Sequence, residues 1–146
     1  NDINPKLLLD PWTTKESYLF KNNCNSVGFG YCENLGEYRL LTEVFKISES
    51  QIAFGENVNL LKKEKRRFDL IISFPPFGVR SKSFENSISK DFATDLLIES
   101  CLKLRENGVL GFLMAVRFVF DKRIKRALKS KGIFIILCYS LEISDH

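Results

Sequence analysis

Residues 68–78 contain the side chains best suited to chemistry, because an aromatic ring there follows a short apolar run and two prolines. The run 70–72 is too short for a helix face and predicts a buried strand. Open α/β sheets bind ligands just beyond the carboxyl ends of parallel strands. Pro75 and Pro76 restrict the backbone after this strand and hold the ring of Phe77 at a fixed height. A rigid ring in that position is suited to stacking on a flat ligand.

The elements that must position this ring alternate between short apolar runs and helical patterns, which is typical of a parallel sheet with helices on its faces. Six strands are predicted, at residues 7–9, 27–33, 52–54, 68–72, 109–120 and 133–141. Helices are predicted from Thr13 or Thr14 to about residue 20, and at residues 35–45, 91–106 and 122–131. Right-handed crossovers then give a doubly wound, mostly parallel α/β sheet with helices on both faces, with Asp10 and Phe77 on one rim.

Length and composition predict one packed domain, 1–146, because 45% of the 146 residues are hydrophobic and 12% are aromatic. No apolar run approaches the roughly 18 residues of a membrane span, and the first residues lack the hydrophobic region of a signal peptide. A cytoplasmic location is therefore expected. The chain starts with Asn1 rather than Met, which indicates a domain excised from a longer protein.

The cysteines and the histidine form no metal-binding pattern. The four cysteines include no C-x-x-C pair, and the single histidine is the last residue, His146. Neither a zinc site nor a disulfide framework is predicted. Reduced thiols in the core are the expected role of Cys24, Cys32, Cys101 and Cys138.

Basic residues account for the net charge of +4 and gather in two places, residues 62–67 and the predicted helix 122–131. That helix begins at Lys122 and ends at Lys131, with a narrow apolar strip that includes Ile124 and Leu128. Its cations form either a solvated face or a contact surface for DNA, and the solvated face is the more common role of such a helix.

Residues 68–78 resemble the segment F-D-x-I-x-x-N-P-P-F-G of N6-adenine DNA methyltransferases of the type I restriction-modification kind, at ten of eleven positions. The resemblance implies that the catalytic positions are Phe74, Pro75, Pro76 and Phe77. In the family, the Asn that Phe74 replaces and the carbonyl of the first proline accept the amino hydrogens of adenine. The aromatic residue at Phe77 stacks on a base flipped out of the duplex.

A side-chain acceptor is missing at the position where this chemistry needs one. Methyl transfer to an exocyclic amine requires the methyl donor in line with the nitrogen lone pair, and polar acceptors free that lone pair by binding the amino hydrogens. Phe74 offers no such acceptor. Ser73 carries a hydroxyl one position earlier, but strand alternation predicts that it faces away from the site.

Residues 7–19 look like the cofactor loop of the same family, L-D-P-x-C-G-x-G-G-F-L, which implies S-adenosylmethionine as cofactor near Asp10 and Thr14. Thr14, Glu16 and Ser17 occupy the positions of glycines that let the backbone approach the carboxylate of the cofactor. Glu16 also brings a negative charge toward that carboxylate. Cofactor binding is therefore predicted to be weak.

Two further motifs place the remaining cofactor residues. Residues 30–40 are similar to G-x-E-I-N-x-x-x-Y-x-L, which puts Cys32 at the position of the acid that binds the ribose, with Glu33 one residue later. A shift of one residue along a strand points a side chain to the opposite face. Gly55-Glu56 matches a Gly-Asp motif and puts Glu56 near the adenine of the cofactor. Residues 109–120 also resemble the family, with Arg117 where a proline is usual.

Two functions remain open from the sequence. The first is an N6-adenine DNA methyltransferase domain with reduced or lost activity. The second is a non-catalytic module that keeps the methyltransferase fold for binding nucleic acid or a protein partner subunit. The resemblance implies a Rossmann-like sheet of six strands without the usual seventh strand. The affinity for S-adenosylmethionine separates the two functions.

Overall fold

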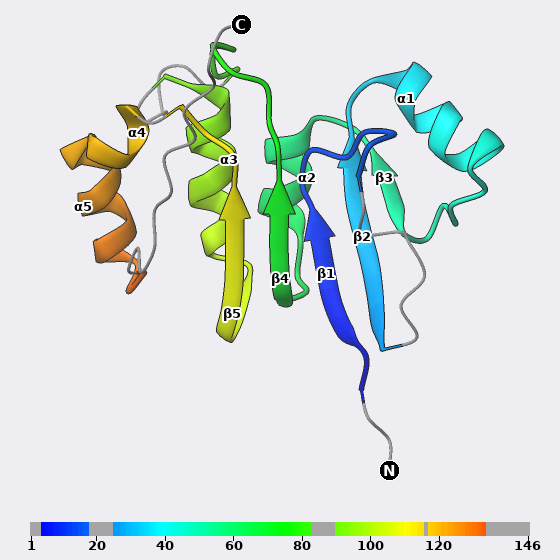
Figure 1. Ribbon diagram of the computed structural model, residues 1–146, viewed down its shortest axis with the longest axis horizontal. Helices are drawn as coiled ribbons and strands as arrows, with labels where there is room; N and C mark the ends of the chain where they lie inside the picture. The colour runs from blue at the N-terminus through cyan, green and yellow to red at the C-terminus, as the bar shows by residue number, and fades with distance from the viewer. Residues whose placement is uncertain (1–3, 18–24, 83–89, 116, 134–146) are drawn as a thin grey trace, which may run out of the picture.

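The computed structural model describes residues 4–17, 25–82, 90–115 and 117–133. Within these residues, five parallel strands form one sheet in the order β3-β2-β1-β4-β5 (Figure 1). The strands are β1 (Lys6–Asp10), β2 (Ser26–Cys32), β3 (Ile52–Phe54), β4 (Phe68–Ser73) and β5 (Leu104–Phe112). The predicted doubly wound α/β sheet is thus confirmed. The predicted sixth strand, 133–141, lies outside the described residues from residue 134 onward.

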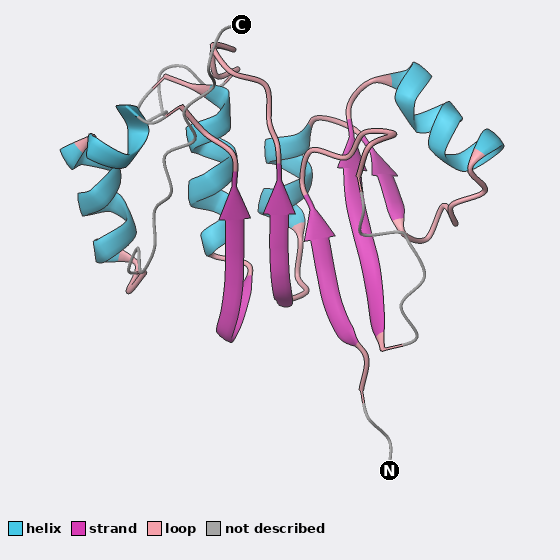
Figure 2. Ribbon diagram, in the orientation of Figure 1, coloured by secondary structure: helices cyan, strands magenta, loops and turns pink. Residues whose placement is uncertain are grey.

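The helices connect and cover these strands, as Figure 2 shows. They are α1 (Leu35–Arg39), the π-helical segment η1 (Leu40–Val44), α2 (Asn57–Lys63), α3 (Phe92–Cys101), α4 (Arg117–Phe120) and α5 (Lys122–Ser130). From β2 the chain continues outward to β3 at one edge of the sheet. The β3–β4 and β4–β5 connections run toward the opposite edge, which β5 forms. Right-handed crossovers therefore place α1 and η1 on one face and α2 and α3 on the other. No helix of the described residues is long and apolar enough to span a membrane.

The main core lies between the central strands and the helices α2 and α3. Leu9 of β1 and Ile71 of β4 are fully buried, and so are Leu61 of α2 and Leu96 of α3. In the sheet, Leu9 pairs with Ile71, so the two central strands end side by side. The apolar contacts thereby fix the rim on which the candidate site is built.

The predicted helix from Thr13 or Thr14 is wrong for residues 13–17, which form turns. The hydroxyl of Ser17 accepts a hydrogen bond from the N–H of Thr14, and the N–H of Ser17 donates to the carbonyl of Thr14. Ser and Thr side chains compete in this way with helical hydrogen bonds. The rest of the predicted helix lies outside the described residues.

Helix α2 is absent from the sequence-based prediction. Its apolar contacts to the core come mainly from Val58 and Leu61, and its last residues run into the basic segment 62–67. The apolar positions of α2, Val58, Leu60 and Leu61, are too few to reveal an amphipathic pattern. The helix forms because tertiary packing against α3 and the sheet overrides this weak local signal.

The boundary between α3 and β5 also differs from the prediction. The helix predicted at 91–106 ends at Cys101, the strand predicted at 109–120 spans Leu104–Phe112, and residues 117–120 form α4. Leu104 pairs with Phe68 and Val109 with Leu70, so residues 105–108 bulge out of the ladder. The Asn107-Gly108 pair makes this bulge, with Asn107 in the left-handed conformation at φ 62°, instead of ending a helix.

Two of the four cysteines belong to the described residues, and both are buried and free, as expected for core thiols. Burial raises the pKa of Cys101 to about 11, so this thiol stays protonated at neutral pH. Cys24 and Cys138 lie outside the described residues.

Candidate functional site

The rim beyond β1 and β4 brings Asp10 and Ser73 into contact. The hydroxyl of Ser73 donates a hydrogen bond of 2.8 Å to the carboxylate of Asp10, and both side chains are buried. Ser73 is buried and Phe74 is exposed, so Ser73 points into the protein and away from the exposed ring of Phe74, as strand alternation predicts. Ser73 follows the buried Ile71 by two residues and so shares its face of the strand, and on that face it meets the last residue of β1.

The carboxylate of Asp10 organises the loop that follows β1. It accepts hydrogen bonds from the hydroxyl of Ser17 and the N–H of Trp12 in addition to that from Ser73. Burial raises the pKa of Asp10 to about 6, because loss of hydration outweighs the three hydrogen bonds that lower it. The carboxylate is thus turned into the protein, where it holds the two ends of the loop together.

The backbone N–H groups of this loop all donate to acceptors within the protein. Six successive N–H groups, from Trp12 to Ser17, donate to protein acceptors at N···O distances of 2.9 to 3.3 Å. The acceptors, in chain order, are Asp10 Oδ1, Tyr31 O, Ser17 Oγ, Glu37 Oε2, Thr14 Oγ1 and Thr14 O. A ligand carboxylate at this loop would have to break these bonds before it could form its own.

The three residues at the glycine positions of the loop have ordinary backbone conformations. Lys46, Lys90 and Asn107 are the non-glycine residues with positive φ in the described part of the chain, so Thr14, Glu16 and Ser17 are not among them. The loop is therefore not a glycine loop with larger side chains added. It has its own backbone path, built around side-chain hydrogen bonds.

Cys32 is the last residue of β2, and Glu33 follows it on the same rim. Cys32 is buried and its thiol donates to the carbonyl of Asn34 at 3.4 Å, and burial raises the pKa of the thiol. A neutral thiol cannot replace a carboxylate that binds two hydroxyl groups. Glu33 is half-buried and forms an ion pair of 2.8 Å with Lys82. Both side chains thus already have partners in the protein.

Glu56 lies beyond β3 and caps the amino end of α2. Its carboxylate accepts hydrogen bonds from the N–H groups of Val58 and Asn59, at 3.2 and 2.9 Å. Next to it, the buried Asn57 donates from Nδ2 to the carbonyl of Pro11 at 2.7 Å and so ties α2 to the loop after β1. The sequence analysis missed Asn57, because no motif marks it.

The segment after β4 presents two aromatic rings at the surface. Phe74 is 59% exposed and Phe77 is 55% exposed, whereas Pro75 is buried and Pro76 is half-buried. Gly78 follows with a φ of 70°, a left-handed turn that favours glycine. The four predicted catalytic positions thus lie at the same rim as Asp10, and Phe74 offers a ring where the resemblance calls for an amide.

Comparison with known proteins gives no sequence relative, since no protein-family model and no curated protein matches the chain. Among solved structures, TrmN from Thermus thermophilus is similar over 85% of this chain and 36% of its own, with 19% identity and a TM-score of 0.55. The chain has a Rossmann-like methyltransferase fold. It spans about a third of the length of TrmN. Precorrin 8w decarboxylase from Methanobacterium thermoautotrophicum matches over 88% of this chain and 64% of its own, with 12% identity and a TM-score of 0.48.

The cofactor implied by a methyltransferase fold is S-adenosylmethionine, and the residues of the rim do not fit it. Its carboxylate would need N–H groups of the loop after β1, which are used within the protein, and would meet the exposed Glu16. Its ribose would need an acid at the end of β2, where Cys32 is a buried thiol. Among the described residues, the loop after β1 and the end of β2 therefore do not supply the groups that would hold this cofactor.

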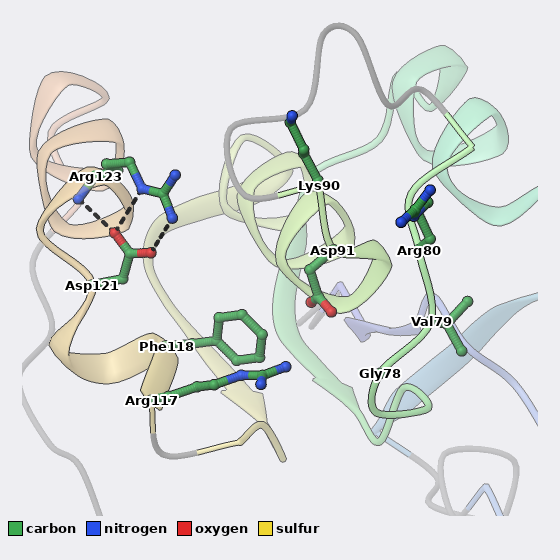
Figure 3. Close-up of a pocket in the computed structure, with 9 residues that line it drawn as sticks. All are labelled: Gly78, Val79, Arg80, Lys90, Asp91, Arg117, Phe118, Asp121 and Arg123. Carbon is green, nitrogen blue, oxygen red and sulfur yellow. Dashed lines mark hydrogen bonds and ion pairs between the residues drawn. The ribbon is translucent and has the colours of Figure 1, made fainter.

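A cavity of about 400 Å³ opens on the other side of the loop after β4 (Figure 3). Gly78, Val79, Arg80, Lys90, Asp91, Arg117, Phe118, Asp121 and Arg123 line it. Asp10 and the segment 74–77 are not among these residues. The sequence analysis missed the cavity because it assigned residues 109–120 to a strand. The basic and aromatic pair Arg117-Phe118 was the signal that could have pointed to it.

Proposed function

We propose that this chain is a methyltransferase-fold domain of the N6-adenine DNA methyltransferase type that has lost methyl transfer. The observation that supports this most directly is the loop from Trp12 to Ser17, whose six N–H groups are all hydrogen-bonded within the protein. The resemblance of residues 68–78 to the family's catalytic segment supports the type. Phe74, which has no side-chain acceptor for an amino group, supports the loss of activity.

The first test is the affinity for S-adenosylmethionine measured by calorimetry. The dissociation constant is expected to be no tighter than about millimolar, because each loop hydrogen bond broken by the ligand costs part of its binding free energy. A matched measurement on a variant with Glu16→Gln separates charge repulsion from the closed backbone. Low-micromolar binding by the unaltered chain would overturn the proposal.

A second function, nucleic-acid binding without catalysis, is favoured by the surface of α5. Ile124 and Leu128 of this helix are buried in a small core with Ile98 and Cys101, which fixes the helix to α3. The opposite side carries exposed cations at Lys122, Arg123, Lys125, Arg126, Lys129 and Lys131. Such a face is suited to contact the phosphates of duplex DNA without reading its sequence.

The α5 face predicts weak duplex binding with a steep salt dependence. Replacing Lys122, Lys125, Arg126 and Lys129 by Gln should lower the slope of log affinity against log salt, by about 0.9 for each phosphate that is no longer neutralised. Arg123 is left in place because it pairs with Asp121. The control replaces Lys62, Lys63 and Lys65, which are exposed at and beyond the carboxyl end of α2, and should leave the slope unchanged. Equal slopes in all three proteins would mean that the α5 face is only solvated.

A further inference from the structure

The cavity beside α4 has walls that are fixed by the fold. On one side, the N–H of Ser81 donates to the carbonyl of Lys90, and the N–H of Phe92 donates to the carbonyl of Val79. These bonds fasten the segment after Gly78 to the start of α3. On the other side, Phe118 packs against the core that holds α5. The cavity is therefore preformed, with a volume in the range usual for small-molecule sites.

The lining of this cavity has an excess of positive charge. Four cationic and two acidic side chains line it. Arg80 and Lys90 have interactions of their own within the protein and Arg123 pairs with Asp121, which leaves Arg117. Both carboxylates already bind groups of the protein. Asp121 pairs with Arg123 at 2.9 Å, and Asp91 caps α3 by accepting from the N–H of Thr94 at 3.1 Å. The arrangement favours an anionic ligand over a cationic one.

Arg117 is the side chain best placed to bind such an anion. Its guanidinium lies 4.9 Å from the centre of the Phe118 ring, and Figure 3 shows both side chains reaching from α4 into the space toward Asp91. Within the described residues, the side chain of Arg117 makes no ion pair and no hydrogen bond. Contact with a ring uses the face of a guanidinium and leaves its N–H donors in the plane for a phosphate.

We propose that this cavity binds a nucleotide, with the phosphate on Arg117 and the base on the aromatic and apolar wall that includes Phe118. An arginine beside an aromatic ring suits a ligand that joins an anion to a flat ring, because stacking and charge then act together. The site is separate from Phe77, which does not line it, and from the rim around Asp10. It therefore goes beyond the proposed function and requires neither a cofactor nor the exposed side of α5.

Calorimetry at low salt with adenosine 5′-monophosphate tests the proposal. Adenosine is expected to bind at least about tenfold more weakly, because it lacks the charge-assisted hydrogen bonds of the phosphate. Inorganic phosphate should also bind at least about tenfold more weakly, because it lacks the stacking base. Equal affinity of the monophosphate and either fragment would overturn the proposal.

Variants of Arg117 locate the binding. Arg117→Gln is expected to weaken binding of the monophosphate by about tenfold, and Arg117→Lys by less, because lysine keeps the charge without the planar fork. The matched control, Lys125→Gln with Arg126→Gln, removes two charges from the neighbouring helix outside the cavity and should bind normally. Arg117 is exposed, so thermal melting should be unchanged in its variants. Normal binding by Arg117→Gln, or an equal reduction in the control, would contradict the assignment.

The nucleotide could come from a free pool or from a single strand of nucleic acid. A short single-stranded oligonucleotide that displaces the monophosphate, and whose binding also weakens in Arg117→Gln, would identify the polymer as the source. Failure of the oligonucleotide to displace it would identify the free nucleotide. The α5 variants can lose duplex binding and still bind the monophosphate in the cavity. The hypothesis of duplex binding by α5 and the hypothesis of nucleotide binding in the cavity are therefore tested separately.

Discussion

The Phe74→Asn variant is expected to transfer no methyl group to adenine in DNA. The substitution restores the acceptor that the catalytic segment lacks, and one preorganised hydrogen bond at a transition state can change a rate by about a hundredfold or more. No transfer is expected even so, because the N–H groups of the loop from Trp12 to Ser17 already bind protein acceptors, and we expect this loop not to hold the methyl donor. Methyl incorporation into adenine-containing DNA measures the result.

Methyl transfer is expected only when the cofactor loop is rebuilt as well. The combined variant carries Phe74→Asn together with glycine at Thr14, Glu16 and Ser17 and aspartate at Cys32. Its control is the same combined variant with Phe74→Ala, which should be at least about a hundredfold slower. The ring of Phe74 is 59% exposed, so the substitution leaves no core cavity. Activity from Phe74→Asn alone would show that the loop accepts the cofactor and would overturn the proposed loss of function.

The Asp10→Asn variant is expected to remove most of the pH dependence of stability between pH 5 and pH 7. The pKa of Asp10 is about 6 in the folded protein and 3.8 as its ordinary value, so the native state binds the proton more tightly. Stability therefore falls as pH rises from about 4 to about 6, by roughly 3 kcal/mol in full. About 1 kcal/mol of this loss of stability occurs between pH 5 and pH 7. Chemical denaturation at both pH values measures it.

Glu64 supplies a control whose titration lies outside this window. Burial opposes ionisation of Glu64, but hydrogen bonds from Arg66 and Tyr31 outweigh it and hold its pKa at about 2. Its contribution to stability is present above about pH 4.5 and is lost as pH falls toward 2. Glu64→Gln should therefore lower stability but keep the slope between pH 5 and pH 7. A wild-type slope in Asp10→Asn would show that this carboxyl does not titrate as described.

Local patterns were sufficient for the strands β1 to β4 and for the helices α3 and α5. The apolar runs at 7–9, 52–54 and 68–72 each form a strand, because a short apolar run between turn residues has few other places in an α/β domain. The pattern at 122–131 forms α5 with Ile124 and Leu128 buried, as predicted. Each of these elements carries enough apolar residues to define its own buried side.

Elements with weaker patterns depended on their neighbours. Helix α2 has few apolar positions and forms against α3, and the Asn107-Gly108 pair is compatible with a helix end as well as a bulge. The pairing of Leu104 with Phe68 and of Val109 with Leu70 decides for the bulge, because residues 105–108 must then fit between two neighbouring ladder positions of β4. The Asn107-Gly108 pair by itself does not specify whether a helix ends there or a neighbouring strand makes it a bulge.

The candidate site also has one part that the sequence determines and another that depends on tertiary contacts. The sequence by itself determined that Asp10 and the segment around Phe77 share a rim, because residues that follow neighbouring parallel strands must end at the same edge. Only the tertiary structure decided that the loop after β1 is closed and that Ser73 turns toward Asp10. The acceptors and donors concerned include Tyr31, Glu37 and Ser73, which are distant along the chain. Hydrogen bonds depend on distance in space, which spacing along the sequence does not record.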